Sequence, residues 1–102
     1  MAVLAMLELD GDSAGLMAAS AKLDELRPRV DGLLLRMAAP TVTGMVLFQL
    51  WESPEARQRN QDDPTHSEAL QTSGMKTLVK GSRATTFEDV ELRRIAVTEA
   101  RR

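Results

Sequence analysis

The clearest pattern in the chain is the apolar run at residues 45–51, which read MVLFQLW and contain Gln49 as their only polar member. Seven residues are the length of a β-strand and too few for a buried helix. Ser53 and Pro54 follow at once. They suit the start of a helix, because a serine hydroxyl accepts a hydrogen bond from a free backbone N–H and proline lacks that N–H. The pattern therefore predicts a strand that passes directly into a helix.

Three other segments have the apolar content of strands. Residues 3–9 and 32–38 predict the first two strands of the chain, and residues 85–97 predict the last. Because Phe87 is out of phase with Val90 in the alternating pattern, we expect a β-bulge in this last strand.

Two helical regions are predicted between these strands. Apolar residues recur at helical spacing from about residue 13 to residue 26, where a following proline ends the helix. The second region runs from residue 54 to about residue 73, with a break and a new helix start at 62–64 and with Gly74 as its terminating residue. Residues 75–84 show no clear pattern and are expected to form a loop.

This order of elements, β-α-β-β-α-β, predicts an α+β fold of the ferredoxin-like class: a four-stranded antiparallel sheet with helices on one face. We assign it to a single domain over residues 1–97, with a polar tail at 98–102. A sheet covered on one face should alternate apolar and polar residues, yet the strand at 45–51 is apolar on both faces. The second face needs cover, and the simplest cover is a second copy of the chain. We therefore expect a homodimer through the open sheet face, which makes a dimeric α/β barrel.

Composition narrows the functional classes. The net charge of −2 gives no field that would attract nucleic acid or an anionic membrane, and no apolar run is long enough to span a bilayer. The absence of cysteine excludes disulfides and thiolate zinc sites, and it fits a cytoplasmic protein. One histidine and scattered carboxylates give no metal-ligand spacing. We therefore expect no metal and no cofactor.

The run Trp51-Glu52-Ser53-Pro54-Glu55-Ala56, the strand before it and the order of elements resemble the antibiotic biosynthesis monooxygenase-like family of the dimeric α/β-barrel superfamily. The resemblance covers about residues 3–97. Some members of this family oxidise polyketide-like aromatic substrates with molecular oxygen and no cofactor, related members degrade haem, and others act on quinols or have no known activity. The resemblance therefore implies, as one alternative, a cofactor-independent monooxygenase of a small aromatic or quinol-like substrate. It also implies a polar pocket between sheet and helices, with Asn, Trp, Arg and sometimes Tyr or His around the substrate.

The chain differs in two respects from the residue patterns of related proteins. The chain has no tyrosine, so a phenol-assisted version of the chemistry is not expected. The haem-degrading branch of the superfamily has a second tryptophan where this chain has Asn60, and its haem-ligating histidine falls at about Leu70. The resemblance therefore disfavours haem degradation.

Five residues are candidates for a site. Trp51 matches the motif tryptophan, although it also fits a purely structural role in which its N–H bonds a carbonyl. His66 is the only histidine and a possible base, although its position in the first turn of a short helix also fits a surface residue. Asn60 joins them as a catalytic candidate. Arg36, a lone charge on an apolar strand, and Phe48 are candidates for substrate binding.

Two functional hypotheses follow. In the first, the chain is a cofactor-independent monooxygenase acting on a small apolar, electron-rich substrate, and the protein supplies a base, desolvation and shape. In the second, it is a non-catalytic small-molecule-binding or structural dimer of the same fold. A cavity of about 300 Å³ or more with converging polar groups favours the first, and a fully packed core favours the second.

Overall fold

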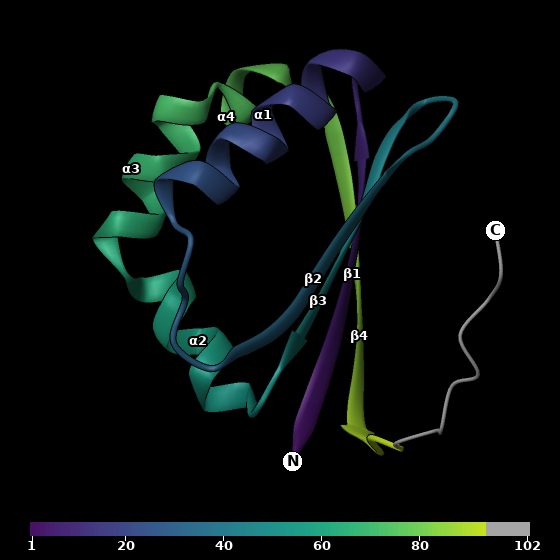
Figure 1. Ribbon diagram of the computed structural model, residues 1–102. Helices are drawn as coiled ribbons and strands as arrows, with labels where there is room; N and C mark the ends of the chain where they lie inside the picture. Colours follow the sequence, from purple (N-terminus) through teal and green to yellow (C-terminus); the bar gives the residue numbers. More distant parts are fainter. Residues whose placement is uncertain (94–102) are drawn as a thin grey trace, which may run out of the picture.

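The computed structural model describes residues 1–93 of the 102-residue chain and shows one sheet covered by helices on one face (Figure 1). Its strands form an antiparallel sheet in the order β2-β3-β1-β4. This arrangement confirms the predicted α+β ferredoxin-like fold. The predicted domain end at residue 97 and the tail at 98–102 lie outside the described residues. In chain order the elements are β1 (Ala2–Asp10), α1 (Ser13–Leu26), β2 (Leu33–Pro40), β3 (Gly44–Trp51), α2 (Pro54–Asp62), α3 (Pro64–Ser73), α4 (Met75–Leu78) and β4 (Gly81–Val90).

The two central strands, β1 and β3, supply most of the sheet's buried side chains. They pair in one continuous antiparallel register that runs from Val3 opposite Trp51 to Asp10 opposite Gly44. Alternate side chains point to the same face of a strand, so one set on each strand faces the helices. The buried members of this set are Val3, Ala5 and Leu9 on β1, and Met45, Leu47 and Trp51 on β3.

Side-chain caps fix where the helices begin. Asp12 accepts a hydrogen bond from the Gly15 backbone N–H (2.8 Å) at the start of α1. Ser53 accepts from the Ala56 N–H (3.1 Å) at the start of α2, as the sequence predicted. Each cap satisfies one of the backbone donors that a helix start leaves without an intrahelical partner.

The break predicted within the second helical region is present. Asp63 ends α2 and caps α3, where its carboxylate accepts from the Thr65 N–H (2.9 Å). Gly74 then ends α3 in the left-handed conformation at φ 81°, which a residue without Cβ adopts at little cost.

The last part of the described chain differs from the prediction. Residues 75–84 are not a loop, because they contain the short helix α4 and the start of β4. β4 begins at Gly81, four positions before the predicted start, and the predicted residues 94–97 of this strand lie outside the described part. The strand is defined by its backbone pairing with β1, and its largely polar, exposed side chains carry no apolar signal.

The strand registers test two predictions: the β-bulge in the last strand and the hairpin between the second and third strands. The bulge expected in the last strand is confirmed, because Phe87 pairs with Leu4 while Val90 pairs with Ala2. The hairpin between the second and third predicted strands is also confirmed, with β2 displaced to Leu33–Pro40 from the predicted 32–38. A register shift between Leu33 and Leu35 was not predicted.

The sheet face away from the helices is uncovered in the single chain (Figure 1). Leu35, Met37 and Phe87 belong to this face, and about half of each side-chain surface remains exposed (49%, 50% and 47%). The central strands add half-buried Met6 and Phe48, which pair across the sheet. Apolar area of this kind on a sheet marks an interaction surface. Among the described residues, no helix is long and apolar enough to cross a membrane.

Candidate functional site

A cavity of about 350 Å³ lies between the sheet and the helices. The central strands provide its apolar floor, and the helices provide a wall that carries most of its polar groups. Its volume falls in the range of small-molecule sites. The lining residues are Leu7 and Leu9 (β1), Leu23 (α1), Leu47, Gln49 and Trp51 (β3), Arg57, Asn60 and Gln61 (α2), His66 and Leu70 (α3), Met75 and Lys76 (α4), Val79, and Ser82 (β4).

The cavity exists because the helix layer does not fill the space above the sheet. The buried residues form two separate clusters. One gathers around Leu16 and Met45, and the other consists of Val3, Trp51 and Ala56. The cavity wall takes residues from both clusters, Leu47 from the first and Trp51 from the second. The α2 side chains beside the gap are those of Arg57, Asn60 and Gln61, which are polar, and Ala56 is the only buried residue of this helix.

Trp51 is a buried residue of the cavity wall, and its indole N–H is a polar group. Only 1% of its surface is exposed, and its indole Nε1 has no hydrogen-bond partner among the described residues. The alternative in which this N–H bonds a carbonyl is therefore wrong for the described part of the chain. A buried donor without a partner costs about 1–3 kcal/mol of stability.

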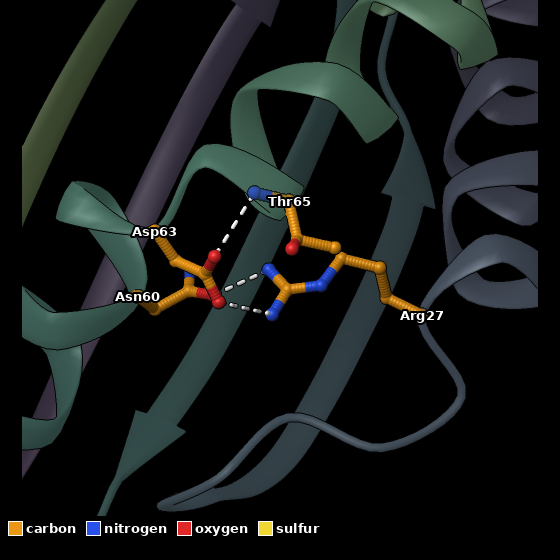
Figure 2. Close-up of polar contacts among 4 residues, drawn as sticks. All are labelled: Arg27, Asn60, Asp63 and Thr65. Carbon is orange, nitrogen blue, oxygen red and sulfur yellow. Dashed lines mark hydrogen bonds and ion pairs between the residues drawn. The ribbon is translucent and has the colours of Figure 1, made fainter.

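Asn60 is held by a residue from a distant part of the sequence. Arg27, at the end of α1, donates through Nη1 to Asn60 Oδ1 at 2.5 Å and lies 3.5 Å from Asp63 Oδ2 through Nη2 (Figure 2). Asp63 in turn accepts from the Thr65 N–H, so one arginine joins the end of α1 to the junction of α2 and α3. The Arg27 side chain is only 11% exposed, which limits competition from water for these contacts.

His66 is half-buried in the first part of α3 and lines the same cavity. Burial lowers the pKa of its imidazole from the ordinary value of 6.5, and the positive charges of Arg27 and Arg36 lower it further, while Asp63 acts in the opposite direction. All of the lowering causes disfavour the imidazolium ion. These surroundings therefore favour the neutral imidazole, the form that can accept a proton.

The structure brings three of the five predicted site residues together: Trp51, Asn60 and His66 all line the cavity. Arg36 lies beside it, in a void of about 10 Å³ that these three residues also border, and its guanidinium pairs with Asp24 of α1 at 2.7 Å. Phe48 is not brought to the cavity. It follows Leu47 on β3 and so faces the opposite, open side of the sheet.

Several lining residues were not among the predicted site residues. Gln49 had a readable signal, since it is the one polar residue of its strand and shares the phase of Leu47 and Trp51. Arg57 lies in a polar helix, a pattern typical of a solvent-facing surface, but it is half-buried and lines the cavity. Arg27 carried no signal, because only the folded chain brings it to Asn60. Within residues 1–93, no group of three or more His, Cys, Asp or Glu side chains could hold a metal ion.

No protein-family model matches the sequence, and no curated protein matches it. Solved structures do. A proposed antibiotic biosynthesis monooxygenase from Chloroflexus aurantiacus J-10-fl superposes with a TM-score of 0.74 at 16% identity, covering 94% of this chain and 100% of the other. The chain has the fold of the antibiotic biosynthesis monooxygenase-like proteins. The resemblance to this fold expected from the sequence is thereby confirmed.

Two further structures extend this likeness. A mutant of SnoaB, a cofactor-independent oxygenase from Streptomyces nogalater, has a TM-score of 0.66 at 14% identity, over 89% of this chain and 93% of its own. A dimeric ferredoxin-like protein of unknown function from Thermobifida fusca YX has a TM-score of 0.68 at 12% identity, over 85% and 90%. Antibiotic biosynthesis monooxygenase-like folds therefore occur both in an oxygenase and in a dimeric protein without an assigned activity.

Proposed function

We propose that this chain is a cofactor-independent monooxygenase that acts on a small aromatic or quinol-like substrate in the cavity between sheet and helices. The observation that carries the proposal is the cavity of about 350 Å³, in which Trp51, Asn60 and His66 stand together over an apolar floor. The amide of Asn60 suits a substrate oxygen. SnoaB, which has the same fold, is a cofactor-independent oxygenase.

The proposed chemistry begins with a proton transfer. His66, whose lowered pKa favours the neutral imidazole, accepts the acidic proton of the substrate, and the Asn60 amide stabilises the oxygen that becomes negative. The substrate anion then reduces molecular oxygen. For an anthrone-type substrate, one oxygen atom enters the product as a carbonyl at the methylene carbon, and the other leaves as water with the two hydrogens that this carbon loses. The apolar floor keeps bulk water from the anion.

Oxygen uptake tests this proposal directly. With anthrone as substrate, the unmodified chain should consume oxygen at a saturable rate above spontaneous oxidation, measured with an oxygen electrode and by product absorbance. Replacing His66→Gln should lower kcat by about 100-fold or more, as removal of a general base does. Asn60→Ala should lower it because a donor to the developing oxyanion is lost. The matched control Arg59→Met removes a cation from α2 that does not line the cavity, and it should leave the rate unchanged.

A folded chain that gives only background oxidation with anthrone and with simple hydroquinones would overturn the proposal. It would favour the alternative, a non-catalytic small-molecule-binding dimer. Equal rates for the unmodified chain and His66→Gln would remove His66 as the base.

We further propose that the working unit is a homodimer closed through the open sheet face. The half-exposed side chains of Leu35, Met37 and Phe87 support this assembly, and solved structures of the same fold are described as dimeric. We also infer a cytoplasmic location, which the cysteine-free composition supports.

A further inference from the structure

Gln49 places a carboxamide in the otherwise apolar floor of the cavity. It lies on β3 between Leu47 and Trp51, on the face turned toward the helices. It also borders the void of about 10 Å³ beside the cavity. A polar group among apolar side chains costs stability unless it is hydrogen-bonded. The role of Gln49 therefore depends on what its amide binds.

Neither neighbour of Gln49 in the sheet binds this amide. The strand registers place Gln49 opposite Ala5 of β1 and Arg36 of β2. Alanine has no polar side-chain atom, and the Arg36 guanidinium pairs instead with Asp24 of α1 at 2.7 Å. Within residues 1–93, none of the side-chain hydrogen bonds involves Gln49. Its amide is therefore left without a partner from the described part of the chain.

A ligand can reach the Gln49 amide, whereas it cannot reach the Trp51 indole N–H. Among the described residues, Trp51 Nε1 is the only fully buried side-chain nitrogen or oxygen without a hydrogen-bond partner. The two amide atoms of half-buried Gln49 also lack partners, so both must keep accessible surface. Because this side of β3 faces the helices, that surface opens into the cavity. Gln49 thus offers a ligand both a donor, Nε2, and an acceptor, Oε1.

Gln49 converges with two polar groups of the helix wall. Asn60 of α2 and His66 of α3 border the same void of about 10 Å³, which is roughly the space of one water molecule. The three side chains therefore meet at one corner of the cavity. Elsewhere the wall includes Leu47 and Met75, which belong to the first apolar cluster. A ring-shaped ligand would thus present one edge to the polar corner and its remaining surface to apolar side chains.

We propose that Gln49 determines the specificity of the site, which selects an aromatic ligand with two oxygen atoms on neighbouring ring carbons. One oxygen faces Asn60 and His66 on the helix wall. The adjacent hydroxyl binds Gln49, since a hydroxyl can both donate to Oε1 and accept from Nε2. This assignment rests on the proposed function for the same site and deepens it by naming how the oxygen substituents are arranged. A ligand without the second hydroxyl is rejected, because it displaces water from the Gln49 amide and offers no new partner.

Three small phenols test this arrangement: catechol, hydroquinone and phenol. Catechol and hydroquinone are isomers that differ in whether their hydroxyls lie on one edge of the ring or at its opposite ends. NMR titration under nitrogen measures binding without oxidation, and the imidazole resonance of His66, the only histidine, reports occupancy of the cavity that it lines. We expect the dissociation constant of catechol to be about tenfold below that of phenol and below that of hydroquinone. Equal or tighter binding of hydroquinone, or the lack of a saturable response to catechol, would overturn the inference.

Gln49→Met tests the residue itself, because methionine is similar in shape to glutamine and lacks its amide. Phenol should bind nearly as before, whereas the advantage of catechol over phenol should disappear. Gln58→Met is the matched control: the Gln58 amide lies on α2, donates to Asp62 Oδ1 at 3.0 Å and is not part of the cavity wall. This control should keep the preference for catechol. A preference that survives in Gln49→Met would contradict the assignment of Gln49.

The stability of the protein without ligand distinguishes a binding role of Gln49 from a structural one. An amide without a partner gives the fold no hydrogen bond, and methionine at this position removes a polar group from an apolar strand. Gln49→Met should therefore resist urea at least as well as the unmodified chain, as measured by circular dichroism. A variant that fails to fold, or that unfolds at clearly lower urea concentration, would show that Gln49 supports the fold and would overturn the inference.

These binding measurements separate the inference from the proposed oxygenase activity. Selective catechol binding together with background oxygen uptake would support the specificity role of Gln49 and overturn the oxygenase. Enzymatic oxygen uptake by a chain that does not distinguish catechol from hydroquinone would do the reverse.

Discussion

His66 is the residue whose charge state depends most on its surroundings. Burial and the nearby guanidinium of Arg27 lower its pKa below the ordinary 6.5, and Arg36 adds to this effect. In the unfolded chain these surroundings are absent, so the imidazole titrates near 6.5. The unfolded state therefore binds the proton more readily than the folded state, and stability is lost as the pH falls below about 6.5.

A single substitution tests this linkage. Between pH 7.5 and pH 5.5 the unmodified chain should lose more resistance to urea than His66→Gln, because glutamine does not titrate. The same chain offers a direct check, since its one histidine gives an unambiguous imidazole resonance whose NMR titration midpoint should lie below 6.5. Equal losses in the two proteins, or a midpoint at or above 6.5, would contradict the expected direction.

At the same scale, the residues of the site differ in how far sequence could reveal them. The position of Trp51 and Gln49 can be predicted from the sequence, because both residues occupy alternate positions of one short apolar strand. The alternation determines which face of the sheet they occupy. Phe48 has the opposite phase, so its proximity in sequence to the site residues was misleading. Arg27 joins the site across 33 positions of sequence. No local pattern encodes such a contact, because it depends on how α1 ends relative to α2.

The start of α2 shows how much one element depends on one cap. The Ser53 hydroxyl accepts from the Ala56 N–H, and α2 offers little apolar burial of its own beyond Ala56. We predict that Ser53→Ala lowers the free energy of unfolding by about 1 kcal/mol, the usual effect of losing a cap. In a domain of this size that corresponds to a fall in Tm of roughly 4–8 °C.

The matched variant for this test is Ser53→Asp, which keeps a capping oxygen and adds negative charge at the positive end of the helix dipole. It should be about as stable as the unmodified chain. Thermal and urea unfolding followed by circular dichroism would measure both variants. A Ser53→Ala protein as stable as Ser53→Asp would show that packing alone determines where α2 begins.

The boundaries of elements with strong local sequence signals were predicted within about two residues. The boundaries of elements held by long-range pairing were not. β3 and α2 carry a glycine, an apolar run, a capping serine and a proline in succession. α4 and the start of β4 carry no comparable signals. Met75 is buried by contact with other elements, and β4 from Gly81 onward is held by its register with β1. Information about those contacts lies outside the segment itself.

For the whole molecule, the two faces of the sheet have separate roles in the proposals made above. The covered face holds the cavity, and the open face carries the apolar surface proposed to pair two chains. Phe48 belongs to the second face, between Met6 of β1 and Met37 of β2. A change on the open face should therefore alter assembly without altering the lining of the cavity.

Met37→Glu tests this separation of roles. Met37 is half-exposed on the open face, and a glutamate there would place a desolvated negative charge in each half of a symmetric interface. Light scattering after size exclusion should give the mass of two chains for the unmodified protein and a shift toward one chain for Met37→Glu. Val42→Glu is the control, because Val42 is fully exposed in the hairpin between β2 and β3, outside both strands. An unmodified chain that runs as a monomer, or two variants that assemble alike, would show that the open face does not pair the chains.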